Sequence, residues 1–196
     1  MPPARLQRWL DNFAARHGDY SLSVESGAMT GLAADGSAFV AHRPFAETYA
    51  GPVDPTAFAQ TCVPPPTWGV LLVRKGGFAI ARQAGERTEE SKVGQRHVQG
   101  RTKAGGQSQR RFARRRDNQA RVAYEAAAEH AARILSRVRI VVAGGDHTAV
   151  DAVLSDDRLA RLVVVPPFLA VPDPRRAVLE QAVVDAGSIR LEVTNA

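Results

Sequence analysis

The chain has 196 residues, 44% of them hydrophobic, which is enough to form a core and excludes a wholly disordered protein. The formal net charge of +6 indicates a polyanionic partner. The single cysteine, Cys62, excludes an internal disulfide and a zinc site built on CxxC pairs. We expect it to be a small, partly buried residue.

The N-terminal residues 1–18 do not resemble a secretion signal. They carry Arg5, Arg8, Asp11 and Arg16 and contain no apolar run. No stretch of the sequence approaches the ~18 apolar residues of a membrane span. A lone thiol also fits a reducing compartment. We therefore expect a soluble, cytoplasmic and monomeric protein without a membrane partner.

The first elements in chain order form an N-terminal extension. Residues 3–16 carry apolar side chains at helical spacing, and strands are expected at 20–25 and 38–42, separated by a turn rich in Gly and Ala. Residues 43–67 are broken by prolines, and the proline run at 64–66 is interpreted as a spacer. We therefore predict two domains, with residues 1–66 as the extension and 67–196 as the main domain.

The main domain is predicted to begin with strands and to continue with alternating strands and helices. Runs at 69–74 and 78–83 predict a hairpin, followed by a more polar strand at 89–98. The glycine-rich residues 99–109 are expected to form an exposed mobile loop. A long helix is expected at 109–136, then strands at 138–143, 162–166 and 189–193 and helices at 147–154 and 175–186. This order predicts an α/β fold with a mixed β-sheet flanked by helices.

The basic charge is concentrated in residues 92–121. This window holds ten Lys or Arg residues and one acid, Asp117, so it carries +9 and the rest of the chain carries −3. Such a local concentration indicates a binding surface. The ten basic residues are Lys92, Arg96, Arg101, Lys103, Arg110, Arg111, Arg114, Arg115, Arg116 and Arg121.

The predicted long helix has one apolar stripe and one basic face. Arg110, Arg114 and Arg121 fall opposite Phe112 and are free to meet phosphates. We expect the stripe to face the core, with Arg116 as its one charged member. The stripe consists of Phe112, Arg116, Ala120, Ala123, Ala127, Ala131 and Ile134.

The loop before this helix contains Gly105, Gly106 and Gln107. Two glycines permit backbone angles that other residues avoid and allow a ligand to approach the main chain closely. The glutamine cannot act as a general base, but it can orient a nucleophile, and its backbone N–H can stabilise developing negative charge. A neutral orienting group beside a basic helix suits a reaction at the end of a nucleic acid.

The segment closely resembles the catalytic domain of eukaryotic and archaeal-type peptide-chain release factors. The shared residues are the GGQS run 105–108 and, at fixed spacing, Arg111, Phe112, Ala113, Arg114 and Arg116. Gln109 stands where that family usually has alanine. A weaker resemblance continues through the VVAGG run 141–145 and the DDRL run 156–159, so that it covers roughly residues 68–195. Without a recognisable stop-codon reader, the chain is most similar to the single-domain Vms-like release factor (VLRF) group.

This resemblance implies an RNase H-like or ribosomal-protein-like sheet and a peptidyl-tRNA hydrolase that releases nascent peptides from stalled ribosomes or large subunits. The implied catalytic residues are Gln107, Gly106 and Gly105. The implied partners are the peptidyl-transferase centre of the large subunit, peptidyl-tRNA and ribosomal RNA, and no metal or organic cofactor is implied. The expected RNA-binding residues are Arg101, Lys103, Arg110, Arg111, Arg114, Arg115 and Arg121.

Three alternatives stay open. The chain could be a nuclease that cuts near the CCA end of tRNA, or a non-catalytic module that binds large-subunit RNA. The basic loop could also serve only to solubilise the chain. Separately, residues 144–147 follow a strand and open a helix as a phosphate-binding turn does, but they lack the known glycine patterns, so we interpret Asp146 or Thr148 as a helix cap.

Overall fold

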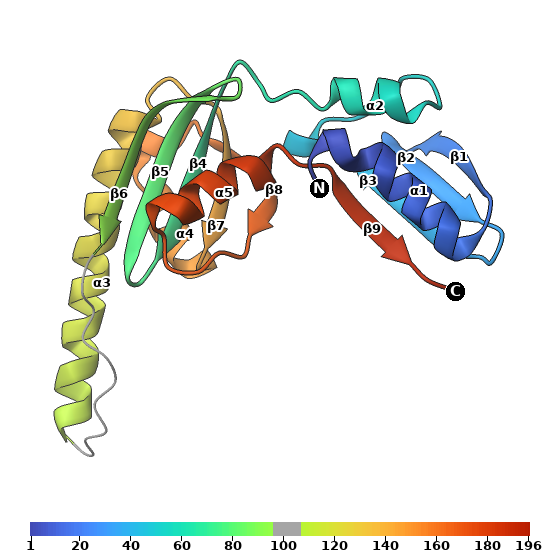
Figure 1. Ribbon diagram of the computed structural model, residues 1–196. Coiled ribbons are helices and arrows are strands. Elements are labelled where there is room, and N and C mark those ends of the chain that lie inside the picture. The colour runs from blue at the N-terminus through green and yellow to red at the C-terminus, as the bar shows by residue number, and fades with distance from the viewer. Residues whose placement is uncertain (96–106) are drawn as a thin grey trace. The chain divides into compact units, whose positions relative to one another are not determined.

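The computed structural model describes residues 1–95 and 107–196, and it describes side chains for residues 1–95 and 121–196. The chain divides into two compact units. The first comprises Met1–Pro65 together with Val183–Ala196, and the second comprises Pro66–Ala182. Each unit has its own sheet (Figure 1), of order β1-β2-β3-β9 in the first and β6-β5-β4-β7-β8 in the second.

The first unit packs one helix on its antiparallel sheet. Helix α1 buries Leu6, Leu10 and Phe13, and the ring of Phe39 meets the rings of Trp9 and Phe13 edge-on at 5.0 and 5.1 Å. These aromatic contacts, with the apolar burial around them, form the core of the unit. Its elements are η1 (Pro3–Arg5), α1 (Leu6–His17), β1 (Tyr20–Glu25), β2 (Ala28–Ala33), β3 (Ala38–His42), η2 (Pro44–Ala46), α2 (Pro55–Thr61) and β9 (Arg190–Thr194).

The C-terminal strand corrects the predicted division into 1–66 and 67–196. Strand β9 pairs with β3 of the first sheet, with Phe39 opposite Val193. The amino group of Met1 donates a hydrogen bond to the carbonyl of Ile189 at 2.8 Å, and the N–H of Ile189 donates back to the carbonyl of Met1 at 2.8 Å. The chain therefore leaves the second unit within α5 (Arg176–Ala186) and ends in the first.

Two elements of the first unit differ from the sequence prediction. The Gly/Ala-rich turn is strand β2, in which Gly31 leaves room for the ring of Phe39 because a Cβ there would lie 2.1 Å from that ring. The proline-broken region contains α2, where Pro55 is the first helical residue and the carboxylate of Asp54 accepts a hydrogen bond from the N–H of Ala57 at 2.6 Å. Proline at this position begins a helix instead of breaking it.

The second unit confirms the predicted mixed sheet. Strand β5 pairs antiparallel with β4 and β6, whereas β7 pairs parallel with β4 and β8. Helices lie against this sheet, and the fold is α/β (Figure 1). The elements are β4 (Thr67–Arg74), β5 (Gly77–Ala84), β6 (Arg87–Gln95), α3 (Gln107–Ile134), β7 (Ile140–Gly145), α4 (His147–Leu154), η3 (Asp157–Leu159) and β8 (Val163–Leu169).

The core of the second unit lies between α3, α4 and the sheet. Leu71 and Ile80 of the sheet and Ile134 of α3 are fully buried in one apolar cluster. Trp68 is 1% exposed and so belongs to the core, and its indole N–H donates to the carbonyl of Gly85 at 2.8 Å. The alanines of α3 are small, which permits close packing of the helix on the strands.

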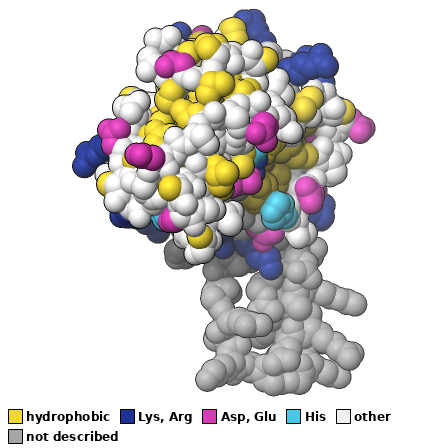
Figure 2. Space-filling view, turned by 90° about the vertical axis from the view of Figure 1, so that its right-hand side faces the viewer, with side chains coloured by type: hydrophobic (Ala, Val, Ile, Leu, Met, Phe, Trp, Pro, Cys, Tyr) yellow, Lys and Arg dark blue, Asp and Glu magenta, His cyan; other side chains and the backbone are white. Residues whose placement is uncertain are grey.

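Within the described part of the chain, no helix has the length and hydrophobicity that crossing a bilayer requires. The face drawn in Figure 2 carries apolar side chains gathered together, with acidic and basic side chains spread around them. The charge on this face is therefore of both signs.

Candidate functional site

The GGQ stretch follows β6 in the chain and ends at the first residue of α3, Gln107. Gly105 and Gly106, with Arg101 and Lys103, fall outside the described residues, as does most of the predicted mobile loop 99–109. Gln107 is the first residue of α3, so the helix begins two residues before the predicted start at 109. The other predicted residues Arg110, Arg111, Arg114 and Arg115 lie on the first turns of α3, and their side chains are outside the description.

Helix α3 is long enough to separate the GGQ stretch from the core. It has 28 residues, which at ~1.5 Å per residue corresponds to about 40 Å. Its C-terminal half packs on the sheet, whereas its N-terminal half extends beyond the end of the sheet (Figure 1). Gln107 is therefore located at the far end of a helical projection.

The packed half of α3 is held by an apolar stripe. Ala123, Ala127, Ala131 and Ile134 are buried, as the helical spacing predicts, and Ala128 is buried beside them. The other predicted members of the stripe have undescribed side chains. Among the described side chains of α3, which begin at Arg121, these residues anchor the helix to the core.

Polar contacts secure the C-terminal end of the helix. The guanidinium of Arg82 on β5 donates to the carbonyl of Ile134 at 3.1 Å. A positive charge at this end is also favourable for the helix dipole. On the same end, Arg133 forms an ion pair with Glu90 of β6, and Glu90 lies 3.5 Å from Arg82. These contacts attach α3 to the hairpin that leads into the GGQ loop.

Arg121 is the one predicted RNA-binding residue whose side chain is described. It is 67% exposed and forms an ion pair with Glu125 at 2.5 Å. It lines a groove of about 630 Å³ between α3, α4, η3 and the turn after β4. Lys75 and Arg158 line the same groove, so tertiary structure adds two cations to the site that the sequence analysis did not select.

The negative charges of this groove offset most of its positive charge. Arg158 donates to Asp156 through two nitrogens, at 2.9 and 2.8 Å. These bonds, with one from the backbone N–H of Arg158, lower the pKa of the Asp156 carboxyl to about 2. Asp156 and Glu125 thus leave a net charge of +1 against the three cations. A phosphate here would have to compete with existing ion pairs. Arg158 belongs to the DDRL run 156–159. The weak resemblance of that run to the release-factor domain was the one feature of the sequence that pointed to this residue.

The turn at residues 144–147 is a helix cap. The carboxylate of Asp146 accepts a hydrogen bond from the N–H of Thr148 at 3.0 Å, which confirms the capping interpretation. Gly145 has φ +106°, and a Cβ there would lie 2.3 Å from the carbonyl oxygen of Val73. Close approach to β4 therefore explains this glycine without a bound phosphate.

For metal binding, the described side chains contain no group of three or more His, Cys, Asp or Glu residues placed to hold an ion. Guanidinium and ammonium groups, such as those of Arg121, Arg158 and Lys75 in the groove, are in general able to donate hydrogen bonds to phosphate oxygens.

Comparison with known proteins gives one family match. The family model described as Actinobacteria/chloroflexi VLRF1 release factor matches residues 66–192. No curated protein matches the sequence.

Two similar solved structures are the Vms1 mitochondrial localization core and the archaeal translation termination factor aRF1. The first is 12% identical with a TM-score of 0.45, over 96% of this chain and 81% of that one. The second is 16% identical with a TM-score of 0.42, over 92% of this chain and 52% of that one. The chain therefore spans about half the length of the archaeal factor.

Proposed function

The chain belongs to the Actinobacteria/chloroflexi VLRF1 release-factor family, and on this premise we propose that it hydrolyses peptidyl-tRNA on the large ribosomal subunit, independently of a stop codon. The observation that carries the proposal is the position of the GGQ stretch. Residues 105–107 lie inside the matched segment 66–192 and directly at the start of α3.

The proposed reaction is ester hydrolysis with water as the nucleophile. The water oxygen forms a bond to the ester carbonyl carbon, and the bond from that carbon to the terminal ribose oxygen breaks. One proton of the water passes to the ribose oxygen, so that the products are a free peptide acid and an intact tRNA. The peptidyl-transferase centre would supply most of the surroundings, and the chain would contribute Gln107.

Gln107 has two proposed roles. Its backbone N–H would stabilise the oxyanion or the leaving ribose oxygen, and its side chain would position the water and exclude larger nucleophiles. The start of a long helix supports the first role, because the N–H groups of the first turn have no partner within the helix and the helix dipole favours negative charge there. Gly105 and Gly106 would permit the backbone to approach the ester closely.

The basic residues around the motif would provide the affinity for RNA. Helix α3 carries Arg110, Arg111, Arg114 and Arg115 within its first turns, next to Gln107. Arg101 and Lys103 precede the motif, and Arg121 follows on the next part of the helix. Arginine binds phosphates through a planar set of donors, so this arrangement would hold the helix against ribosomal RNA or tRNA while Gln107 reaches the ester.

A synthetic peptidyl-tRNA bound to isolated large subunits tests the proposal. Free peptide together with full-length tRNA is the expected result. A tRNA shortened at its CCA end, with the peptide still attached to the fragment, would instead identify a nuclease. Stable binding with neither product would identify a non-catalytic RNA-binding module. Gel analysis of the labelled tRNA and of the labelled peptide in one reaction separates the three outcomes.

A further inference from the structure

A second basic surface lies in the second unit, at the edge where β7 and β8 begin. A groove of about 510 Å³ is located there between the turn before β7 and the turn before β8. Arg137 and Arg139 line it from the first turn, and Arg161 lines it from the second. All three lie outside residues 92–121, the window in which the basic residues of the sequence are concentrated.

The sheet topology brings these arginines together. Strands β7 and β8 are parallel neighbours with Ile140 opposite Val163, so the turns that precede them meet at one edge of the sheet. The N–H of Val163 donates to the carbonyl of Arg139 at 2.7 Å, which joins the two turns directly.

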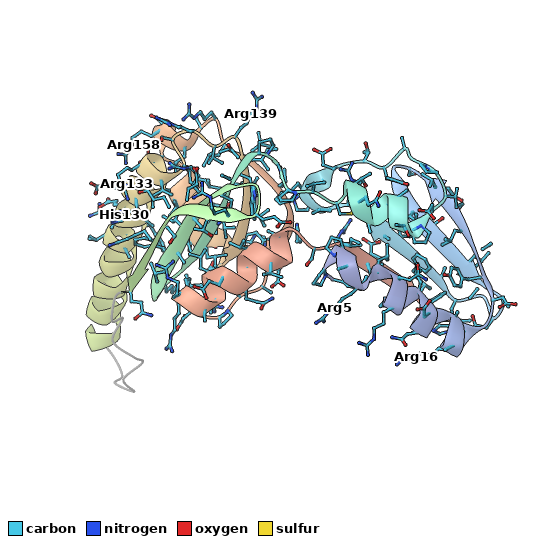
Figure 3. All side chains as sticks on the ribbon, turned by 45° about the horizontal axis from the view of Figure 1, so that its top comes forward. Arg5, Arg16, His130, Arg133, Arg139 and Arg158 are labelled. Atoms are coloured by element: carbon cyan, nitrogen blue, oxygen red, sulfur yellow. The ribbon has the colours of Figure 1, made fainter. Side chains whose placement is uncertain are left out.

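The first turn is also fixed from within. The N–H of Val138 donates to the carbonyl of Leu135 at 2.9 Å, and the Val138 side chain is buried. The flanking residues Arg137 and Arg139 are exposed, and the side chain of Arg139 points away from the body of the unit (Figure 3). Arg137 and Arg139 are therefore presented to solvent by a turn that a hydrogen bond and the buried Val138 side chain hold in place.

The charge of this groove is not compensated. Within the described ranges 1–95 and 121–196, the side chains of Arg137, Arg139 and Arg161 form no ion pair or hydrogen bond, and no acid lines the groove. Six other arginines of the same unit differ in this respect, although Arg175 and Arg176 also form no ion pair among the described residues. Ion pairs with acids are formed by Arg74, Arg82, Arg87, Arg121, Arg133 and Arg158.

Three like charges at one groove repel one another, and an anion would relieve that repulsion. We propose that this groove binds the phosphates of an RNA backbone. Arginine suits phosphate recognition because its guanidinium offers several donors in a fixed plane. Because the cations come from two turns on the two sides of the groove, they can contact more than one phosphate at a time. A nucleic-acid backbone supplies such successive phosphates, whereas a single phosphate ion does not. That the phosphates belong to RNA rests on the proposed function.

The position of the groove gives the contact a specific role. Arg137 follows the last residue of α3, Ile134, by three positions, and Gln107 is the first residue of that helix. The two ends are therefore about 40 Å apart at ~1.5 Å per residue. RNA bound at both ends would fix the direction of α3 as well as its position, and so direct Gln107 toward one point on the ribosome.

The test compares two triple variants of the full chain. One replaces Arg137, Arg139 and Arg161 by Ala, and the matched control replaces Arg5, Arg8 and Arg16 of the first unit, which are also exposed and carry the same total charge. Binding to purified large subunits, and to ribosomal RNA stripped of protein, is measured over a salt series. Each phosphate that the protein no longer neutralises makes the plot of log affinity against log salt less steep by about 0.7 to 0.9. For the groove variant we therefore expect the steepness to fall by about 2 to 3 on both probes.

The control variant should keep the wild-type slope. Equal losses of slope in both variants would overturn the proposal, because net charge alone would then explain them. A folded groove variant that keeps the wild-type slope would also overturn the proposal. So would a variant that binds subunits more weakly but binds stripped RNA unchanged, because the partner would then be a ribosomal protein. Peptide release by the wild type is assayed separately. If the groove variant has a less steep salt dependence but the wild type releases no peptide, the proposed hydrolase function is wrong, whereas the proposed RNA contact of the groove is supported.

Discussion

Arg121 and Glu125 form an ion pair of 2.5 Å, one turn apart on the exposed surface of α3. An exposed pair of this kind contributes only about 0.2–1 kcal/mol to stability. It nevertheless occupies the guanidinium that we propose for RNA binding. Glu125→Gln should therefore leave the melting temperature nearly unchanged and strengthen binding to large subunits by roughly two- to fivefold. Glu180→Gln on α5, which makes the same change in charge, should have a smaller effect, and equal effects would show that Arg121 is not involved.

Replacement of Gln107 by Ala should reduce peptide release while ribosome association stays nearly intact. The affinity is assigned to the charged residues of the +9 window, whereas Gln107 is one neutral side chain. Losing a positioned donor typically costs about 10²–10³ in rate, and the backbone N–H of the variant should preserve some activity. Single-turnover release from large subunits measures the effect. Gln109→Ala is the matched control, and if it is the inactive variant, the catalytic glutamine has been assigned to the wrong position.

Replacement of Arg110, Arg114 and Arg115 together by Ala should weaken binding to the large subunit without unfolding the protein. The salt dependence of binding should become less steep by about one unit of slope for each phosphate that the variant no longer binds. Thermal melting is the control for folding. Arg116 is left unchanged because its spacing places it on the stripe of Phe112 and Ala120. Unchanged affinity and slope in the folded variant would leave the proposed function resting on the GGQ stretch alone.

Cys62 should resist alkylation in the folded protein. The thiol is buried and donates to the carbonyl of Phe58 at 3.4 Å, and burial raises its pKa from 9.0 to about 11. About one thiol in a thousand would then be ionised at pH 8, and the thiolate is the reactive form. Because the pKa is raised on folding, the neutral thiol stabilises the fold fully below pH 9, and this contribution is lost as the pH rises toward 11. Iodoacetamide labelling with and without urea measures the protection, and rapid labelling of the folded chain would contradict it.

Ile189→Ala should destabilise the first unit by about 2–5 kcal/mol, the usual range for truncating a buried aliphatic side chain. Ile189 is 1% exposed, and its backbone exchanges two hydrogen bonds with Met1. Val193→Ala on the adjoining strand is the control, because Val193 is 47% exposed and should cost much less. Hydrogen exchange of β1, β2 and β3 in urea follows this unit. Equal costs for the two substitutions would argue against a core role for Ile189.

Elements with a clear local pattern were predicted well. The buried positions Ala123, Ala127, Ala131 and Ile134 follow a helical repeat, and the hairpin of β4 and β5 follows an apolar run around a Lys-Gly-Gly turn. Strand β2 was missed because Gly31 is a poor strand former in isolation, and helix α2 was missed because Pro55 was interpreted as a break although proline favours the first position of a helix. Gly31 is favourable in β2 because the ring of Phe39, on the neighbouring strand, occupies the space above it. Pro55 is favourable in α2 because Asp54 caps the helix directly before it.

The candidate site divides in a similar way. The GGQ stretch and the arginines beside it could be selected from the sequence because they are contiguous, and their roles stay predictions until the variants above are measured. Lys75 and Arg158 could not be selected as partners of Arg121, because they come from separate turns that meet α3 only in the folded unit. Arg158 is also preceded by two acids, Asp156 and Asp157, so it does not stand out as a basic residue in the sequence.

By itself, the sequence determined the chemistry available at the head of α3 and the mixed α/β character of the chain, since both follow from residues that are close along it. Only the tertiary structure decided that the last strand completes the first sheet, where Met1 and Ile189, 188 positions apart, exchange hydrogen bonds. It also decided that Arg137, Arg139 and Arg161 share one groove. Contacts between distant segments depend on which strands become neighbours, and that choice is made by the burial of the whole core, not by any local pattern.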